Sequence, residues 1–303
     1  MATRLELKGI LVPTTTPFTA DGEEVDERAL RRLIEHVLAA GVAGLVPCGG
    51  TGEFATLSLE ERRRVVDIVA ETCNGRAPIV PHTGSLSTRE TVLLSRAAAD
   101  SGAAAVMVAP PFYDPLRREE IFAHYAAVAS AIALPIVLYN NPAATGVNLT
   151  LDVVESLVSI DSVKFIKDSS GDAAALLALI ERLGDRIGVI NGADALALPA
   201  LLMGASALIW GASNFIPSVC VRLYDLVGRP ETMNEAVALW RSLRPLIDLL
   251  ETQPSVATVK AGCELTGLPV GPPRPPLLPL PSESAARLGQ LIGQLGVQSR
   301  SVS

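Results

Sequence analysis

The chain has very little lysine. Lys and Arg together number 25 in its 303 residues, and four of these are lysine, which leaves 21 arginines. The formal net charge of −7 argues against a nucleic-acid-binding protein, because such a protein needs a basic face. No apolar run approaches the roughly 18 residues that predict a membrane span, and the start of the chain lacks the apolar stretch of a signal peptide. We therefore expect neither nucleic-acid nor membrane partners.

Residues that commonly bind metals or form disulfides are also scarce. The four cysteines are scattered without CxxC spacing, which predicts reduced thiols in a cytoplasmic protein. The three histidines, His36, His82 and His124, lie too far apart in the sequence to form a local metal motif. We therefore expect no bound metal.

Short β-like runs alternate with helical patterns from the N-terminus onward. The strands are predicted at residues 10–15, 44–48, 79–82, 104–109, 136–139, 163–166, 189–191 and 207–210. The segments between them carry apolar residues at three- and four-residue spacing, as in residues 27–40, 59–73 and 88–100. Ser58 followed by Glu61, and Ser87 followed by Glu90, are capping patterns at two predicted helix starts.

Eight such units of about 25 residues each predict an α/β protein, a (β/α)8 TIM barrel with a C-terminal helical extension. A doubly wound sheet is the alternative, but no GxGxxG follows the first predicted strand. We expect the barrel, with the active site, to occupy residues 1–222. A C-terminal helical domain then covers residues 223–303, interrupted by the proline-rich segment 268–281, which cannot form a regular helix.

Lys167 ends a short apolar run and is followed directly by a polar turn, "KDSSGD". Side chains at the C-terminal ends of barrel strands build the active site of this fold. Hydrophobic surroundings disfavour an ammonium group, so a neutral amine becomes available to attack a ketone and form an iminium. The simpler alternative is a lysine that reaches solvent or pairs with Asp168. Lys164 is predicted to face the other side of the strand and to be structural.

Two further segments at the strand ends suggest substrate contacts. In "GGTGE", residues 49–53, glycines around Thr51 allow backbone N–H groups to converge on an anion such as a carboxylate. Tyr139 ends the fifth predicted strand and could relay protons to a substrate. A turn that serves only the chain path, and a tyrosine at the barrel rim, are the respective alternatives.

Taken together, these fragments resemble the dihydrodipicolinate synthase/N-acetylneuraminate lyase family of pyruvate-dependent class I lyases. The resemblance runs from "GILVPTTTPF" near the start to "PLLPLP" near the end, and includes "YNNPAATG" and "IKDSSGD". It implies a (β/α)8 barrel that assembles as a homotetramer, a dimer of dimers. It also implies a small 2-keto acid as substrate and no cofactor beyond the covalent Schiff base on Lys167.

The resemblance assigns roles to individual residues. Lys167 would be the Schiff-base lysine and Tyr139 the proton-shuttling tyrosine. The Gly50 and Thr51 amides, with the Thr51 hydroxyl, would hold the substrate carboxylate, and Ile209 would pack on the pyruvate.

Three other positions complete the site implied by the resemblance. Gly192 and Asp194, in the Gly-x-Asp turn "GAD", would contact substrate. Tyr113 matches a tyrosine that, in the synthases, crosses the tight dimer into the partner's proton relay.

The chain departs from the synthases at positions that concern the substrate and its regulation. Gly50 replaces a hydroxyl residue of their relay, and Ala144 replaces the arginine that binds the carboxylate of aspartate semialdehyde. Trp210 stands where relatives have a small residue, and either narrows the pocket or packs in the barrel. In lysine-regulated synthases polar effector residues follow the Gly-Glu motif, whereas Phe54 and Arg62 stand here, so we expect no inhibition by lysine.

These departures favour a lyase that forms a Schiff base with a 2-keto acid. It would catalyse aldol cleavage or condensation with pyruvate, or dehydration of a 2-keto-3-deoxy sugar acid such as 5-dehydro-4-deoxyglucarate. We expect a hydroxylated substrate to meet hydroxyl, amide and carboxylate partners around the barrel mouth: Ser169, Ser170, Asn191, Asp194, Ser213 and Asn214. One alternative is 4-hydroxy-tetrahydrodipicolinate (dihydrodipicolinate) synthase. Another, of a different class, is a non-catalytic barrel that binds a keto acid.

Overall fold

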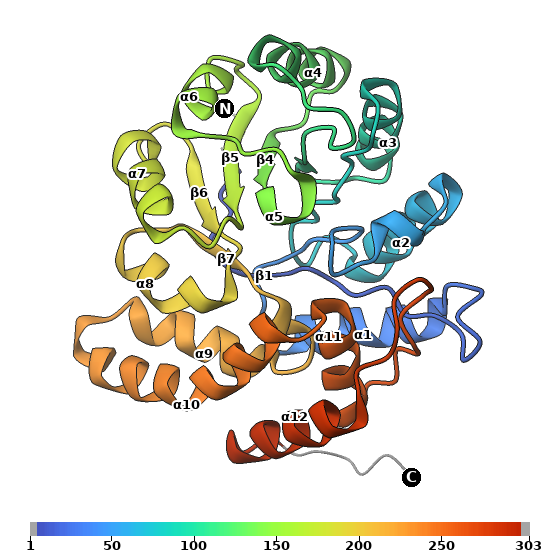
Figure 1. Ribbon diagram of the computed structural model, residues 1–303, viewed down its shortest axis with the longest axis vertical. Coiled ribbons are helices and arrows are strands. Elements are labelled where there is room, and N and C mark those ends of the chain that lie inside the picture. The colour runs from blue at the N-terminus through green and yellow to red at the C-terminus, as the bar shows by residue number, and fades with distance from the viewer. Residues whose placement is uncertain (1–4, 298–303) are drawn as a thin grey trace.

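A curled parallel sheet surrounded by helices forms the body of the protein (Figure 1). The structure is a computed structural model that describes residues 5–297. Seven strands are hydrogen-bonded in the order β2-β1-β7-β6-β5-β4-β3. They are β1 (Gly9–Val12), β2 (Gly44–Leu45), β3 (Val106–Val108), β4 (Ile136–Asn140), β5 (Val163–Asp168), β6 (Gly188–Asn191) and β7 (Ala207–Ile209).

The remaining predicted strand, residues 79–82, is the third in the sequence; it lies between β2 and β3 and closes the ring. It is joined to its neighbours by isolated parallel bridges, Leu45 to Ile79 and His82 to Met107, instead of a continuous ladder. Pro81 lies in this segment and has no N–H to donate, which explains the broken ladder. Its carbonyl still accepts from the Met107 N–H at 2.8 Å. The predicted barrel is therefore confirmed, with one strand reduced to bridges.

Helices cover the outside of the barrel in the predicted order. They are α1 (Glu27–Ala39), α2 (Leu59–Cys73), α3 (Thr88–Asp100), α4 (Arg118–Ala131), α5 (Pro142–Thr145), α6 (Leu151–Leu157), α7 (Ala173–Leu183), α8 (Ala197–Leu202) and α9 (Pro217–Val227). The predicted capping signals are present: Ser58 and Glu61 form a capping box at the start of α2, and the Ser87 side chain caps α3. Each cap satisfies N–H groups that have no partner within the helix.

Alternation along the strands divides the core into an inner and an outer layer. Val137, Phe165 and Ile209 belong to a cluster inside the barrel. Leu138 and Ile166, one residue further along their strands, belong to a second cluster beneath the outer helices. Because side chains alternate along a strand, Lys167 faces the same interior as Phe165.

Three helices follow the barrel and pack against it on one side, shown in orange and red in Figure 1. They are α10 (Met233–Thr252), α11 (Ser255–Leu265) and α12 (Ser282–Gln294). Their buried residues join the same hydrophobic cluster as the α1 and α9 side chains. The predicted boundary at residue 222 falls within α9, and the ends of the two predicted domains, residues 1–4 and 298–303, lie outside the described residues. No helix within residues 5–297 is long and apolar enough to cross a membrane.

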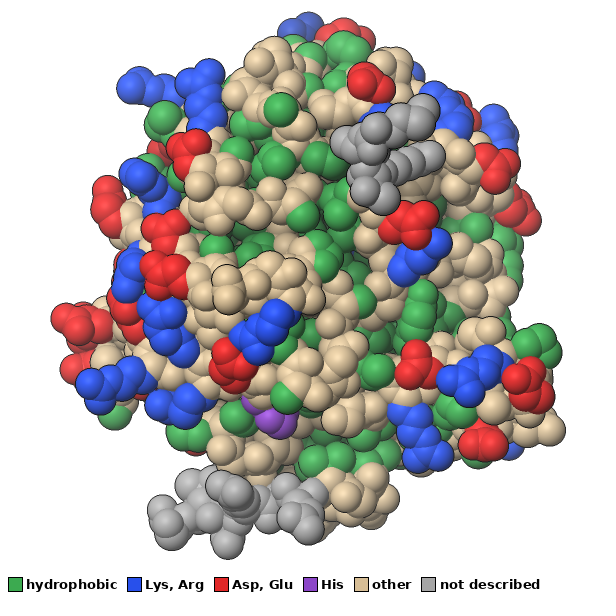
Figure 2. All heavy atoms as spheres, turned by 180° about the vertical axis from the view of Figure 1, so that it is seen from behind, with side chains coloured by type: hydrophobic (Ala, Val, Ile, Leu, Met, Phe, Trp, Pro, Cys, Tyr) green, Lys and Arg blue, Asp and Glu red, His purple; other side chains and the backbone are tan. Residues whose placement is uncertain are grey.

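On the face shown in Figure 2, basic and acidic side chains are intermixed among apolar and neutral polar groups. A nucleic-acid-binding surface would gather its basic residues on one face or stripe. The described residues that are visible on this face form no such surface.

Candidate active site

Lys167 and Tyr139 lie side by side at the C-terminal ends of β5 and β4. They are register partners in the parallel ladder, and the Lys167 Nζ is 4.3 Å from the centroid of the Tyr139 ring. Each residue is only 7% exposed. The structure thus brings together the two residues that the sequence predicted to act as a pair.

Neither simpler interpretation of Lys167 agrees with these contacts. The Asp168 carboxylate accepts hydrogen bonds from Asn140 Nδ2 at 2.8 Å and Ser170 Oγ at 2.6 Å, and within residues 5–297 it forms no ion pair with Lys167. Lys164, in contrast, lies at the surface with its Nζ 3.0 Å from Asp161 Oδ1, as a structural residue would.

Gly192 provides the space that the Lys167 side chain occupies. A Cβ at this position would lie 2.4 Å from Lys167 Cε and 2.2 Å from Ser169 Oγ. Its N–H donates to the Asp168 carbonyl at 2.7 Å, which fixes the turn after β6 against the end of β5. Any larger residue at position 192 would displace the lysine.

The Tyr139 hydroxyl is held by a residue that sequence reasoning missed. Asn141 Nδ2 donates to it at 3.0 Å, and the His82 ring packs edge-on against the tyrosine with centroids 5.8 Å apart. Burial, with the nearby charge of Arg62, lowers the pKa of His82 to about 3, so this imidazole is neutral. Asn141 lies within the "YNN" motif, whereas nothing local in the sequence links His82 to Tyr139.

The Gly50–Thr51 segment forms a tight turn after β2. The Glu53 N–H donates to the Gly50 carbonyl at 3.0 Å, and Glu53 itself adopts a left-handed conformation with φ of 57°. Within residues 5–297 the Gly50 and Thr51 N–H groups donate to no protein acceptor. A turn with two free amides suits an anion. The turn is connected to the Tyr139 side through His82, whose Nδ1 lies 3.1 Å from the Cys48 carbonyl oxygen.

Ile209 and Trp210 face opposite sides of the barrel wall. Ile209 is buried in the interior cluster that also contains Tyr139. Trp210 is buried in the outer layer, where its ring lies 6.4 Å from that of Trp240 in α10. Trp210 therefore packs between the barrel and the C-terminal helices and does not narrow the pocket.

Asp194 follows β6 in the turn that begins with Gly192. Burial raises the pKa of its carboxyl group to about 7, and the like charge of Glu251 adds to this effect. The positive charge of Lys167 acts in the opposite direction. Asp194 is thus placed within electrostatic reach of the lysine, and can be protonated near neutral pH.

Several polar residues that the sequence suggested as substrate partners are occupied within the protein. The Asn214 side chain binds the Thr15 N–H and the Pro13 carbonyl. Ser213 Oγ donates to the Trp210 carbonyl, and Asn191 bonds to the backbone of Ala193. A short polar side chain next to a turn satisfies the local backbone first. The expectation that Asn191, Ser213 and Asn214 face substrate is therefore corrected.

Two residues that the sequence analysis singled out are exposed at the surface. Tyr113 lies in the loop between β3 and α4, is 83% exposed, and makes no side-chain hydrogen bond within residues 5–297. Ala144 is exposed on the short helix α5. Within the single chain, the structure does not bring Tyr113 into the Lys167 site.

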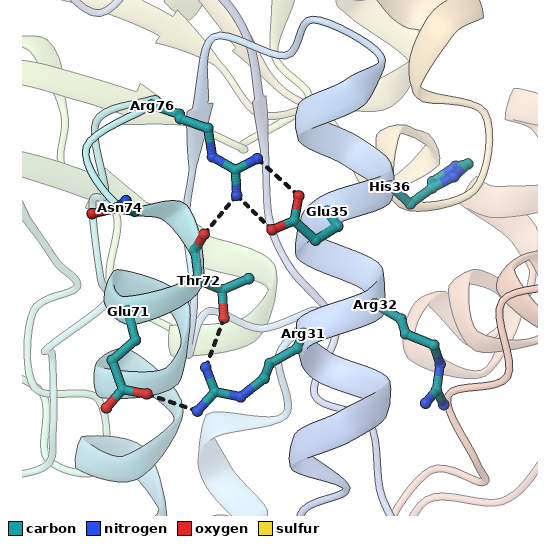
Figure 3. A pocket seen from close by; sticks show the side chains of 8 residues that line it. All are labelled: Arg31, Arg32, Glu35, His36, Glu71, Thr72, Asn74 and Arg76. Atoms are coloured by element: carbon teal, nitrogen blue, oxygen red, sulfur yellow. Dashed lines mark hydrogen bonds and ion pairs between the residues drawn. The ribbon is translucent and has the colours of Figure 1, made fainter.

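Within residues 5–297 no group of three or more His, Cys, Asp and Glu side chains is arranged to hold a metal ion. A hollow between α1 and α2 is lined by charged residues (Figure 3), but two of its three arginines are already paired. Arg76 binds Glu35, Arg31 binds Glu71, and Arg32 points to the other side of α1.

A parallel (β/α)8 barrel in which strand β5 carries a buried lysine at its C-terminal end, beside a tyrosine of β4, defines an enzyme of the class I lyase type. The sequence model of the dihydrodipicolinate synthetase family matches residues 6–295. The chain belongs to this family.

Curated relatives of the chain are named as synthases. It is 37% identical over 290 residues to the 4-hydroxy-tetrahydrodipicolinate synthase of Pelobacter propionicus, covering 96% of this chain and 99% of that protein. It is 38% identical over 299 residues to the enzyme of that name from Sorangium cellulosum, covering 96% and 97% of the two chains. These names favour the synthase, which the sequence analysis placed second, over a sugar-acid lyase.

Solved structures share the fold over nearly all of the chain. The dihydrodipicolinate synthase from Acinetobacter baumannii, complexed with pyruvate, matches with a TM-score of 0.91 at 33% identity and covers 96% of this chain and 99% of that one. A prophage protein of the dihydrodipicolinic acid synthase family from E. coli K12, also in complex with pyruvate, matches with a TM-score of 0.91 at 32% identity, with 96% and 99% covered.

Proposed function

We propose that the protein forms a Schiff base between Lys167 and pyruvate, and that it is a 4-hydroxy-tetrahydrodipicolinate synthase, which condenses the bound pyruvate with aspartate semialdehyde. The observation that carries the proposal is the buried Lys167–Tyr139 pair at adjacent strand ends. The synthase names of the relatives and the pyruvate in two related structures support the choice of substrates.

The residues divide the covalent step between them. The neutral Lys167 amine adds to the C2 carbonyl of pyruvate, and loss of water leaves an iminium that bears one positive charge. The iminium accepts the electron pair of a C3–H bond when that proton leaves, which gives an enamine nucleophile. Tyr139 would carry protons between these intermediates, with its hydroxyl oriented by the Asn141 amide at 3.0 Å. No cofactor takes part in this scheme.

The substrate carboxylate would bind at the Gly50–Thr51 turn. The two free N–H groups of the turn and the Thr51 hydroxyl would provide three donors for the negative charge. Ile209 would pack on the pyruvate from the inner wall of the barrel, and Gly192 and Asp194 would border the second substrate.

Ala144 supports a second candidate, a 2-keto acid with a neutral, hydroxylated tail. Without an arginine at this position, a bidentate partner for a distal carboxylate is missing. The internal hydrogen bonds of Asn191, Ser213 and Asn214 weigh against this candidate, because they remove polar partners that a sugar chain would need.

The test compares kcat/KM for pyruvate plus aspartate semialdehyde with kcat/KM for cleavage of 2-keto-3-deoxygluconate. The synthase predicts the larger value for aspartate semialdehyde in the wild type. A larger value for the sugar acid, reversed by Ala144→Arg, would establish the second candidate instead. The variant Ala143→Arg is the matched control, since it adds the same charge one position away.

Assembly and compartment belong to the same proposal. The exposed Tyr113 agrees with a homotetramer in which this residue contacts a second copy. All four cysteines are buried free thiols, which agrees with a reducing compartment such as the cytoplasm.

A further inference from the structure

Glu53, the last residue of the "GGTGE" segment, forms the most buried ion pair among the described residues. Its Oε1 lies 2.7 Å from Lys260 Nζ, and the two side chains are 0% and 2% exposed. Glu53 lies directly after the Gly50–Thr51–Gly52 turn, whereas Lys260 belongs to α11 of the C-terminal layer. The pair therefore joins the turn that would bind the substrate carboxylate to helices outside the barrel.

The proline-rich segment holds the same carboxylate from its other side. The Arg274 N–H donates to Glu53 Oε2 at 2.8 Å, and Lys260 Nζ donates to the Pro272 carbonyl at 2.8 Å. Both cations also contact the Phe18 ring, with Lys260 Nζ and Arg274 Cζ each 4.1 Å from its centroid. Both carboxylate oxygens of Glu53 thus have partners from the C-terminal part of the chain.

Arg274 anchors the proline-rich segment by binding one residue before the start of α2 and one in its first turn. Its guanidinium binds the Glu61 carboxylate with two contacts of 3.0 and 2.9 Å, and donates to the Thr56 carbonyl at 3.0 Å. The proline-rich segment also passes very close to the N-terminal loop, because a Cβ on Gly271 would lie 2.1 Å from the Phe18 carbonyl oxygen. The proline-rich segment therefore contacts both the start of α2 and the N-terminal loop.

A buried ion pair adds little to the free energy of unfolding. The cost of removing both charges from water offsets much of their attraction, and an apolar pair of similar volume is often as stable. Such a pair instead fixes the positions of its two side chains, because separating them would leave two buried charges unpaired. Glu53 is also held with φ of 57°, which an L-residue keeps only when its surroundings fix it. Through its N–H bond to the Gly50 carbonyl, that fixed residue sets the shape of the turn.

We propose that Glu53 and Lys260 are positioning residues that hold the Gly50 and Thr51 amides in place for a substrate carboxylate, so that the C-terminal layer sets the affinity of the barrel site. The inference rests on the proposed function, in which that turn binds the keto acid carboxylate. Neither residue takes part in the covalent step, because Lys167 alone supplies the amine.

The test uses full-length Glu53→Gln, which keeps the side-chain volume and an acceptor for the Arg274 N–H but leaves Lys260 without its counter-charge. Borohydride trapping is measured against the concentration of pyruvate and, separately, of methyl pyruvate, which lacks the carboxylate charge. We expect the half-saturating pyruvate concentration to rise about tenfold or more, which corresponds to about 1.4 kcal/mol. Trapping at saturation, and the methyl pyruvate titration, should stay within about twofold of wild type.

Two controls separate positioning from loss of stability. Leu291→Ala, in the buried face of α12, lowers the melting temperature without touching the pair and should leave both titrations unchanged. The double variant Glu53→Gln/Lys260→Met removes both charges, so it should fold even if the single variant does not, and it should also weaken pyruvate more than methyl pyruvate.

The outcomes are distinguishable. An equal shift for pyruvate and methyl pyruvate, or no shift in either Glu53 variant, would overturn the positioning role while the Schiff base stood. Failure of the wild type to trap pyruvate at all would instead contradict the proposed function.

Discussion

Asp194 is an acidic residue placed beside the proposed Schiff-base lysine. Its turn follows β6, and the neighbouring Ala195 N–H donates to Glu251 Oε1 of α10 at 3.1 Å, which fixes a second carboxylate nearby. The pKa of Asp194 is raised from its ordinary value of 3.8 to about 7, first by burial and then by Glu251. A carboxyl group that titrates near neutral pH at a strand end is typical of functional sites.

This shift predicts a pH-dependent stability. Between pH 3.8 and about 7 the folded chain holds a proton on Asp194 that the unfolded chain has released, so the free energy of unfolding falls as the pH rises through this window. Asn cannot titrate. The melting temperature of Asp194→Asn minus that of the wild type should therefore increase from pH 4 to pH 7 by a few degrees. Above pH 7 this difference should stay constant. Thermal unfolding across this range is the measurement.

The surface variant Asp161→Asn is the control for that series, since its carboxylate is exposed and pairs with Lys164. The difference in melting temperature between Asp161→Asn and wild type should not rise steadily between pH 4 and pH 7. A gain for Asp194→Asn that is the same at every pH would show that Asp194 keeps an ordinary pKa.

At the scale of single elements, the start of α2 lies where lysine-regulated synthases carry polar effector residues. Here the buried Arg62 guanidinium lies 5.3 Å from the centroid of the Phe54 ring, and donates to the His82 and Gly84 carbonyls at 2.9 and 3.1 Å. A fixed positive charge and an aromatic ring thus fill this region. An amino acid with a terminal ammonium group would meet like charge there.

We therefore predict that lysine neither binds nor inhibits. Calorimetric titration with millimolar lysine should give no saturable heat, and the initial rate should stay within about 10% of its value without lysine, as repulsion outweighs any contact. Pyruvate titrated into the same sample is the positive control. Saturable lysine binding would contradict the claim that the charge of Arg62 repels an amino acid with a terminal ammonium group.

The elements themselves were largely predictable, because their signals are local. The α2 and α3 bounds agree with the sequence analysis, since Ser58 and Ser87 mark the helix starts. Strand bounds were less predictable: β5 runs two residues past its predicted end, whereas the run at residues 44–48 keeps only Gly44 and Leu45 as strand. A turn begins at Pro47, which has no N–H to continue the ladder. Segment 79–82 carries a proline, which reduces its ladder to bridges.

The candidate site was predictable only in part. Lys167 and Tyr139 were found because each ends a strand within a motif. The Glu53–Lys260 pair joins residues that are distant in the sequence, so only the fold brings them together. The internal bonds of Ser213 and Asn214 were missed because composition does not tell whether a polar group faces substrate or backbone.

At the scale of the whole molecule, the exposed Tyr113 predicts a site completed by a second copy. In an isologous dimer each chain would supply its Tyr113 to the partner's Lys167 site. Tyr113→Phe and Lys167→Ala should each be nearly inactive alone. A mixed dimer contains one site with both residues intact.

Co-refolding the two variants in equal amounts should therefore restore about a quarter of wild-type activity, because half of the dimers are mixed and each has one complete site of two. Steady-state rates before and after mixing are the measurement. Absence of recovery, with mixed dimers shown by native mass spectrometry, would place Tyr113 outside the relay.

The central claim is that Lys167 forms an iminium with pyruvate. The most direct measurement is borohydride reduction in the presence of pyruvate, followed by peptide mapping of the intact adduct. The account predicts one reduced adduct on the peptide that contains Lys167, lost in Lys167→Ala and retained in Lys164→Ala. An adduct on Lys164 instead, or one that persists undiminished in Lys167→Ala, would contradict it.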